Sequence, residues 1–195
     1  MRVLMRRLVL AAFVSLVLLL VPATAALGWP DVGAEDLAPY GLTQADLEGM
    51  SEGYTDGTWK PYDQMSRGQF VKMAVEAWDI PLLSPDAPSY ADVPRDNAFY
   101  PYIEAAAAAN LVTGTGGGYF DPFGTLTREQ AAAVIARWIA RTDGYTLSTY
   151  FAASEITALL GGFGDGREVS TSLQQEVTFA IDWQVMLGTA DNYLR

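Results

Sequence analysis

Apolar positions recur at helical spacing along much of the chain. One stretch places them three and four residues apart at Ile103, Ala106, Ala107 and Leu111. Two further stretches have the same spacing, one at Phe70, Met73, Ala74, Ala77 and Trp78, the other at Ala131, Val134, Ile135, Trp138 and Ile139. Each stripe predicts an amphipathic α-helix that buries one of its faces.

Glycine, proline and capping residues mark where these helices end and begin. Residues 113–118 contain four glycines, which end the preceding helix and require a loop. Ser66 and Thr127 each stand three residues before a glutamine, Gln69 and Gln130, which is the pattern of a capping box. The chain therefore predicts units of helix, loop and helix.

The chain repeats itself at a spacing of 61 residues. Trp29-Pro30-Asp31-Val32 returns as Tyr90-Ala91-Asp92-Val93, and Trp59-Lys60-Pro61 returns as Phe120-Asp121-Pro122. The same spacing relates other positions: Gly53 to Gly114, and Ser66-Arg67 to Thr127-Arg128. Correspondences at one ungapped register indicate internal duplication. We assign repeat 1 to residues 28–81 and repeat 2 to residues 87–144.

Residues 145–195 predict a connector, with a short helix near residues 154–160, and a partial repeat 3. Phe163-Gly164-Asp165 resembles the opening of repeat 2, and Thr171 with Gln174 forms another capping-box pattern. At this register the counterpart of Arg128 would fall beyond Arg195. We therefore expect that no helix covers the apolar face of the following stretch. That face is Val177, Ala180, Ile181 and Val185. We also expect residues 163–195 to be the part of the mature chain that is least protected from hydrogen exchange.

The first 25 residues predict a signal peptide. Three arginines precede an apolar run from Leu8 to Val21, and Ala23-Thr24-Ala25 provides a cleavage site with small residues. The run is shorter than the roughly 20 residues that span a bilayer. We expect cleavage after Ala25, secretion, and no membrane span in the mature chain.

Composition and charge exclude several classes of function. The chain has no His and no Cys, which excludes Ser-His-Asp triads, thiol nucleophiles, disulfides and zinc sites built on His or Cys. Its formal net charge of -11 argues against nucleic acid, which needs basic surface. No metal site and no cofactor are expected.

These motifs, in this order, resemble the S-layer homology (SLH) family. Its pattern is an aromatic-x-Asp-Val opening, a helix, a Gly-rich stretch, an aromatic-x-Pro, and Thr-Arg-Ala-Glu at the start of a second helix. The resemblance implies an all-α fold of tandem helix-loop-helix repeats in a pseudo-threefold bundle, with the third repeat incomplete. It also implies binding of secondary cell-wall polysaccharide, often bearing a pyruvate ketal, in grooves between repeats. This chain departs from the pattern because Gln replaces the Glu of the motif in both copies, and repeat 3 has no such motif.

The candidate ligand-binding residues follow from that resemblance: Arg67, Arg128, Gly53, Gly114, Ser66, Thr127, Trp59 and Phe120. Arg67 and Arg128 would contact the pyruvate carboxylate, because a guanidinium binds a carboxylate through two parallel hydrogen bonds and helix N–H groups nearby favour anions. We expect Arg128→Ala to weaken binding more than Arg67→Ala, since repeat 2 fits the pattern better. Capping alone explains Ser66 and Thr127, and the aromatic residues belong either to a sugar site or to the core.

Three functions follow, in order of preference. The first is a non-catalytic module that anchors a protein to the cell wall or S-layer through secondary cell-wall polymer or peptidoglycan-linked glycan. The second is a structural protein of the S-layer that self-associates through apolar faces. The third is a secreted glycoside hydrolase that uses two carboxylates, for which the repeats leave no separate segment. We also expect Asp31 and Asp92 to accept hydrogen bonds from backbone donors in the turn that opens each repeat.

Overall fold

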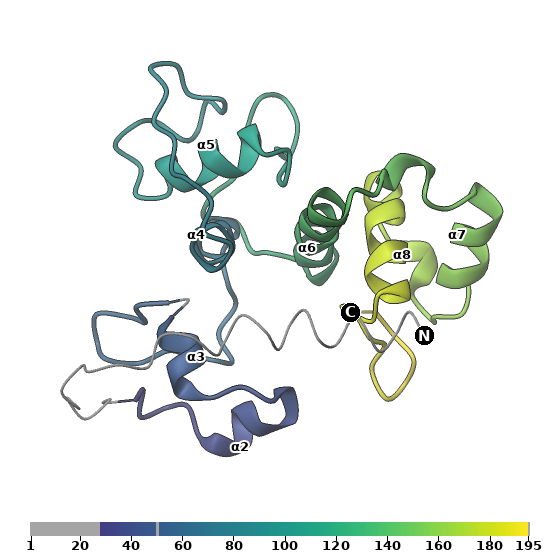
Figure 1. The fold of residues 1–195 in the computed structure, drawn as a ribbon, viewed down its shortest axis with the longest axis horizontal. Helices are drawn as coiled ribbons and strands as arrows, with labels where there is room; N and C mark the ends of the chain where they lie inside the picture. The colour runs from purple at the N-terminus through teal and green to yellow at the C-terminus, as the bar shows by residue number, and fades with distance from the viewer. Residues whose placement is uncertain (1–27, 50, 195) are drawn as a thin grey trace.

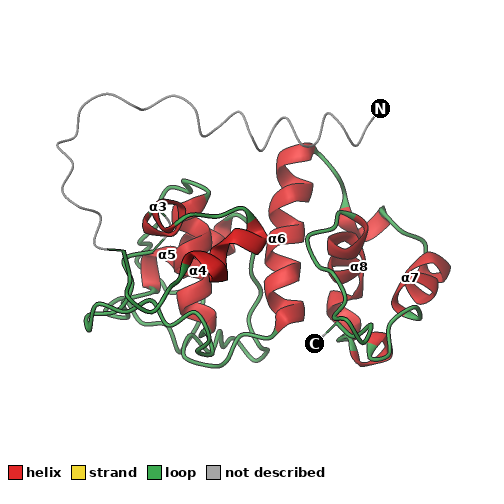
Figure 2. Cartoon of the chain, turned by 90° about the horizontal axis from the view of Figure 1, so that it is seen from below, coloured by secondary structure: helices red, strands yellow, loops and turns green. Residues whose placement is uncertain are grey.

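The computed structural model describes residues 28–49 and 51–194. Within these residues the chain forms seven α-helices and four short 3-10 helices, without a β-strand (Figure 2). The all-α prediction is confirmed. None of the described helices is long and apolar enough to cross a membrane. The predicted signal peptide lies outside the described residues.

The helices follow one another along the chain with short connections. The α-helices are α2 (Ala34–Leu37), α3 (Gln44–Glu48), α4 (Arg67–Ala77), α5 (Tyr100–Ala108), α6 (Arg128–Asp143), α7 (Ala153–Leu160) and α8 (Gln174–Asp182). The 3-10 helices are η1 (Ala38–Tyr40), η2 (Leu147–Thr149), η3 (Gly166–Glu168) and η4 (Thr171–Leu173). Helix α7 confirms the short helix expected in the connector.

Three hydrophobic cores divide the described chain into three lobes (Figure 1). Lobe 1, residues 28–65, has the smallest core, with three buried apolar residues next to Trp29 and Trp59. Lobe 2, residues 66–126, is built on α4 and α5, and Val134 of α6 completes its core. Lobe 3, residues 127–194, is built on α6, α7 and α8.

The second helix of each repeat packs into the core of the next repeat. Helix α4 comes from repeat 1, yet its Val71 and Val75 share a core with Ile103 of α5. Helix α6 comes from repeat 2 and packs along α8. The lobes are therefore displaced by one helix from the units that the sequence comparison delineates.

This displacement overturns the expectation that the apolar face of α8 lacks a covering helix. Val177 and Ala180 are completely buried, in one core with Ala132, Ala136 and Ala140 of α6. The prediction was wrong because it sought the covering helix inside repeat 3, whereas the preceding repeat supplies it. Ile181 remains half-buried, and Val185 is exposed.

The capping-box predictions for the two longer helices are confirmed. At the start of α4, Ser66 Oγ accepts a hydrogen bond from Gln69 N at 3.2 Å, and Ser66 N donates to Gln69 Oε1 at 2.8 Å. Thr127 and Gln130 make the same pair of bonds at 3.3 Å each.

The third predicted capping box is wrong. Thr171 lies in the 3-10 helix η4, and α8 begins only at Gln174, after Leu173, without a side-chain cap. A 3-10 turn therefore leads directly into α8 at the point where a capping residue was expected.

In each lobe an aspartate accepts hydrogen bonds from backbone N–H groups near the C-terminal end of that lobe. Asp31 accepts hydrogen bonds from the backbone N–H groups of Trp59 and Lys60, and Asp92 accepts them from Phe120 and Asp121, at 2.7–3.1 Å. In lobe 3, Asp165 accepts one from Leu194 N at 2.7 Å. The expectation of backbone donors was right, but the principal donors lie 28 or 29 residues downstream.

Candidate functional site: a groove between lobes 2 and 3

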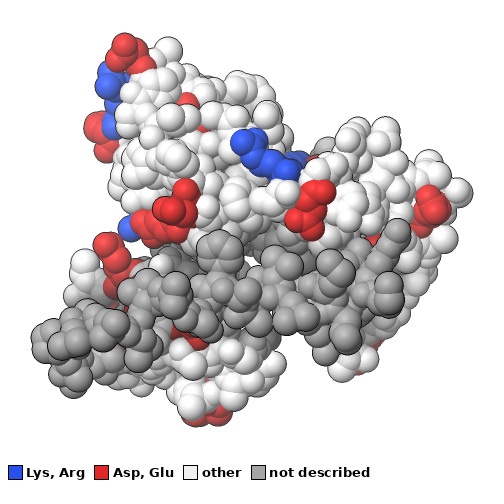
Figure 3. Space-filling view, in the orientation of Figure 1, with Lys and Arg blue, Asp and Glu red and all other residues white. Residues whose placement is uncertain are grey.

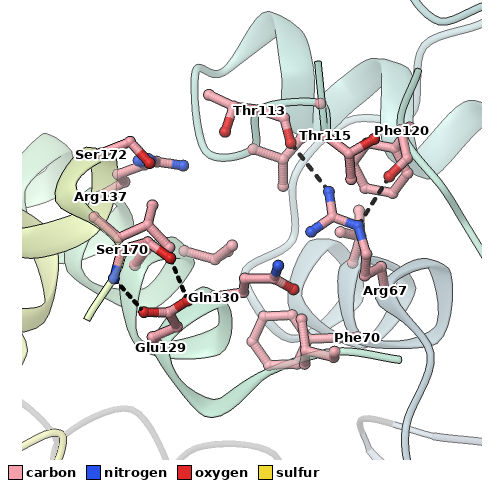
Figure 4. Close-up of a pocket in the computed structure, with 17 residues that line it drawn as sticks. Arg67, Phe70, Thr113, Thr115, Phe120, Glu129, Gln130, Arg137, Ser170 and Ser172 are labelled. Atoms are coloured by element: carbon pink, nitrogen blue, oxygen red, sulfur yellow. Dashed lines mark hydrogen bonds between the residues drawn. The ribbon is translucent and has the colours of Figure 1, made fainter. Parts of the chain in front are cut away.

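A groove with a volume of about 260 Å³ lies between α4, the loop after α5, α6 and the segment before α8 (Figure 4). We call it groove 1. Its polar lining residues are Arg67, Thr113, Thr115, Glu129, Gln130, Arg137, Ser170 and Ser172. Phe70, Val71, Leu126 and Leu173 contribute apolar surface. The groove therefore combines hydrogen-bonding groups with an apolar wall, as small-molecule sites do.

Arg67, the first residue of α4, is held firmly at one side of groove 1. Its Nε donates to Phe120 O at 2.9 Å, and its Nη2 donates to Thr113 O at 3.1 Å. The guanidinium lies 4.6 Å from the centre of the Phe120 ring, a cation–π distance. Only 9% of the residue is exposed. Arg67 therefore joins α4 to both ends of the Gly-rich loop, residues 113–120.

The Arg67 guanidinium keeps donors for a ligand. Among the described residues its hydrogen bonds go to those two carbonyls, which leaves Nη1 available. Figure 4 shows this nitrogen turned into the groove, on the side of Gln130. Burial lowers the pKa of Arg67, and the nearby Asp121 carboxylate raises it in part. The side chain remains a cation at neutral pH, because an arginine starts from such a high pKa.

The N–H groups at the start of α4 are already occupied. The backbone N–H of Arg67 donates to Gly124 O at 3.0 Å, and that of Gly68 donates to Pro122 O at 2.8 Å. Residues 122–126 run antiparallel to this turn, and Leu126 N donates to Met65 O. The expectation that this helix terminus assists anion binding is therefore wrong for α4.

The opposite wall of groove 1 contains charges that are already paired. Arg137 contacts Glu176 of α8 at 2.8 and 3.0 Å and donates to Leu111 O at 3.2 Å. Glu129 accepts hydrogen bonds from the backbone and hydroxyl of Ser170 at 2.9 and 2.7 Å. Among the described residues that line groove 1, Arg67 is thus the cation without a carboxylate partner.

The structure separates the predicted site residues into different places. Arg67, Gly114 and Phe120 lie together in groove 1. Gly53 and Trp59 line a second groove, of about 270 Å³, beside lobe 1, which we call groove 2. Arg67 therefore lies beside the Gly-rich loop of the following repeat, whereas Gly53 of its own repeat lines groove 2.

Phe120 and the two glycines have mainly packing roles. Phe120 is 1% exposed and packs on Tyr90 with ring centres 5.2 Å apart, so it belongs to the core. A methyl group on Gly114 would overlap Tyr119 O and lie 2.9 Å from the Tyr90 ring. Gly53 has a φ of +67° and would place a Cβ 2.9 Å from Thr58 O, a conformation that glycine tolerates. Both loops therefore require glycine.

Arg128 repeats the Arg67 contact one lobe further along the chain. Its Nη2 donates to Leu187 O at 2.7 Å and its Nη1 to Leu194 O at 3.3 Å. Leu187 and Leu194 stand 74 residues after Thr113 and Phe120, the carbonyls that Arg67 binds. Unlike Arg67, Arg128 is exposed, and it is not among the residues that line groove 1. Ser66 and Thr127 act as helix caps, and neither lines groove 1 or groove 2.

Sequence reasoning missed several residues of groove 1: Gln130 as a lining residue, Glu129, Arg137, Ser170 and Ser172. Arg137 stands two helical turns after Gln130, next to the apolar stripe of α6, and this placement was the available signal. Ser170 and Ser172 come from lobe 3, and nothing in their local sequence indicates that they line a groove shared with lobe 2.

Comparison with known proteins shows which family part of the chain matches. The sequence model of the S-layer homology domain matches residues 89–132. The chain is 32% identical over 138 residues to an endoglucanase of Bacillus sp. (strain KSM-635), a match that covers 71% of this chain and 14% of that protein.

Two S-layer proteins are also similar to the chain. It is 23% identical over 171 residues to the S-layer protein sap of Bacillus anthracis, covering 88% of this chain and 19% of the relative. It is 28% identical over 127 residues to an S-layer protein of Bacillus thuringiensis subsp. finitimus, covering 65% and 15%. The chain thus spans less than a fifth of the length of each of these relatives. Their match and that of the family model confirm the resemblance read from the repeats: residues 89–132 are an S-layer homology domain.

Proposed function

We propose that this chain contains a non-catalytic module that anchors a protein to the cell envelope by binding secondary cell-wall polysaccharide. The S-layer homology domain supports this proposal, as does the similarity to two S-layer proteins. An endoglucanase is also similar to most of this chain, over a small part of its own length. A segment common to an enzyme and to S-layer proteins is better explained by attachment than by catalysis.

The observation that carries the proposal is the position of Arg67 in groove 1. Two backbone carbonyls fix its guanidinium, so a ligand need not immobilise a flexible side chain. The remaining donors suit an acidic substituent on a sugar, such as the carboxylate of a pyruvate ketal. Gln130, Thr113 and Ser172 also line the groove, and their side chains suit the hydroxyl groups of the same sugar.

Sedimentation of residues 26–195 with purified cell walls tests the proposal. We expect binding that disappears when the secondary polymer is stripped from the walls. Arg67→Ala should weaken binding about ten- to a hundredfold, since a charge-assisted hydrogen bond contributes roughly 1.5–3 kcal/mol. Lys at position 67 should not restore it, because a point charge does not reproduce a two-pronged contact.

Arg141→Ala is the matched control. Arg141 is an exposed residue of α6 whose Nη1 donates to Ala109 O at 3.1 Å, so it also joins α6 to lobe 2. The variant loses one arginine and one interlobe hydrogen bond outside groove 1, and should bind walls as the unaltered chain does. Equal binding by all variants, or binding to stripped walls, would exclude the proposal.

Because Arg128 is exposed and outside groove 1, we expect Arg67→Ala to weaken binding more than Arg128→Ala does. This is the reverse of the order expected from sequence.

A further inference from the structure

Groove 2 is built from the same parts of the repeat as groove 1. It lies beside lobe 1, between the loop at residues 51–54, the segment 59–65 and one face of α4. Gly53 and Gln69 line it where Gly114 and Gln130, 61 residues later, line groove 1. With about 270 Å³ it has nearly the volume of groove 1. The fold therefore offers two related cavities whose linings can be compared position by position.

The lining of groove 2 is more aromatic than that of groove 1. Tyr54 stands where groove 1 has Thr115, and the half-buried Trp59 stands where groove 1 has the fully buried Phe120. Two methionines and an aromatic ring from lobe 2 complete the apolar surface: Met65, Met73 and Phe99. Gln69 Nε2 donates to Tyr54 Oη at 3.0 Å, which fixes the phenol at the edge of the groove.

The charged residues that line groove 2 disfavour the binding of an anion. Lys72 lies between two carboxylates, with its Nζ 3.4 Å from Glu52 and 3.8 Å from Glu76. Lys60 pairs with Asp56 at 3.1 Å and lies 4.4 Å from the centre of the Tyr54 ring. Among the described lining residues, groove 2 therefore has no cation without a carboxylate partner.

One pair of equivalent positions shows most directly that the two grooves differ in charge. Position 76 carries a glutamate, whereas the corresponding position 137 of groove 1 carries an arginine. Groove 2 also has the carboxylate of Asp63 in its lining. An acidic sugar would meet carboxylates here, where groove 1 presents Arg67.

We infer that groove 2 binds an uncharged sugar residue against Tyr54 and Trp59, while groove 1 binds an acidic residue of the same polymer. This inference rests on the proposed function and assigns different ligand chemistry to two related grooves. Aromatic rings offer a flat apolar surface with a polar edge, which suits the face of a neutral pyranose. The volume of groove 2, about 270 Å³, is just below the roughly 300–1,000 Å³ of pockets for drug-sized ligands, so it suits a ligand as small as a single sugar residue.

Two defined probes test the inference: the methyl glycoside of N-acetylglucosamine and the same glycoside bearing a pyruvate ketal. Amide chemical shifts in the ¹⁵N-labelled chain report where each probe binds. We expect the neutral glycoside to shift the amides of Gly53 and Gln69, and the ketal to shift those of Gly114 and Gln130. A neutral glycoside that shifts only groove 1, or shifts neither groove at saturating concentration, would overturn the inference.

Single substitutions separate the two grooves. Tyr54→Thr copies the residue of groove 1 at an exposed position, and should weaken the neutral glycoside about three- to tenfold while leaving the ketal unaffected. Arg67→Ala should do the opposite. Equal loss of both probes in either variant would count against separate chemistry.

The two proposals can also fail separately. If the ketal binds groove 1 and walls bind, but the neutral glycoside does not reach groove 2, only the inference fails. If wall binding survives removal of the secondary polymer, the proposed function fails, wherever the glycosides bind.

Discussion

A single arginine in each of the first two repeats connects that repeat to the next one along the chain. Arg67 binds carbonyls at both ends of the loop 113–120, and Arg128 binds two carbonyls near the end of lobe 3. The position of both residues is unusual, because a cation in the first turn opposes the helix dipole, and the sequence singled out both as ligand-binding candidates. It did not reveal their partners, since these are backbone atoms of a different repeat. Their first role is to position loops, and only Arg67 also lines groove 1.

Asp92 is the residue whose replacement tests how the segment after the Gly-rich loop is held in lobe 2. Its carboxylate accepts hydrogen bonds from Phe120 N and Asp121 N at 2.8 and 2.7 Å. Asp92→Ala should reduce the free energy of unfolding by about 2 kcal/mol, less than two fully buried charged hydrogen bonds would contribute, because the carboxylate is partly solvated. Asp121→Asn, a neighbouring exposed carboxylate, should change it by less than about 0.5 kcal/mol. Urea titration of both variants decides, and equal stabilities would contradict the assigned role.

The same carboxylate predicts a dependence of stability on pH. Burial raises the pKa of Asp92, but the N–H groups of Phe120 and Asp121, and the charge of Arg67, outweigh it and hold the pKa below its ordinary value. A lowered folded-state pKa means that the contribution is complete above the unfolded pKa of about 3.9 and is lost as pH falls through the folded pKa. The stability difference between the unaltered chain and Asp92→Ala should therefore be constant near neutral pH and shrink in acid. A difference that grows with acidity would contradict this.

At the scale of elements, the sequence predicted helices well and their partners poorly. The apolar stripes of α4 and α6 were recognised because period and capping residues agree. The short helices α2 and α3 carry no comparable stripe and were not predicted individually. A stripe tells which face of a helix is buried but not which segment buries it. For that reason α6 was not recognised as the cover of α8.

The two capping patterns that behave differently provide a test at this scale. Thr127 caps the 16-residue helix α6, and its hydroxyl accepts the hydrogen bond of Gln130 N. Thr127→Ala should lower the free energy of unfolding by about 1 kcal/mol. Thr171→Ala changes the same residue type in the same sequence pattern, but Thr171 caps no helix. Thermal unfolding should show a lower midpoint for the first variant and an unchanged one for the second. A similar loss in both would mean that Thr171 does act as a cap.

For the whole molecule, the net negative charge acts on a charged ligand over long distances, whereas single basic side chains act on it only at short range. The net charge of -11 gives an acidic polymer no long-range attraction. Figure 3 shows one group of basic side chains near the junction of lobes 2 and 3 and others at the outer edge of lobe 2, with acidic side chains close to each of these groups. The proposed recognition of an acidic sugar would then rest on contacts inside groove 1. Arg67, Gly114 and Phe120 of that groove were among the predicted residues. The rest of its lining could not be predicted, because the groove exists only where segments far apart in sequence meet.

The three cores predict an order of local opening that differs from the one the sequence suggested. Lobe 1 has three buried apolar residues, Val32, Leu37 and Leu47, around two short helices. Lobe 3 has eleven, including Val177 and Phe179 of α8 beneath α6. Because local stability follows the number of buried apolar contacts, lobe 1 should open before lobe 3.

Hydrogen exchange on residues 26–195 measures that order. Amides of α3 should exchange fastest among the α-helices α3, α4, α6 and α8, and those around Val177 should be protected as strongly as those around Val134 in α6. Leu47→Ala should speed exchange in lobe 1 alone, since its core is separate from the other two. Met186→Ala, at a buried position of lobe 3, is the matched change and should speed exchange in α8 while leaving α3 as it was. Faster exchange in α8 than in α3 in the unaltered chain would show that lobe 3 is the weaker unit, and that the packing of α6 on α8 does not protect it.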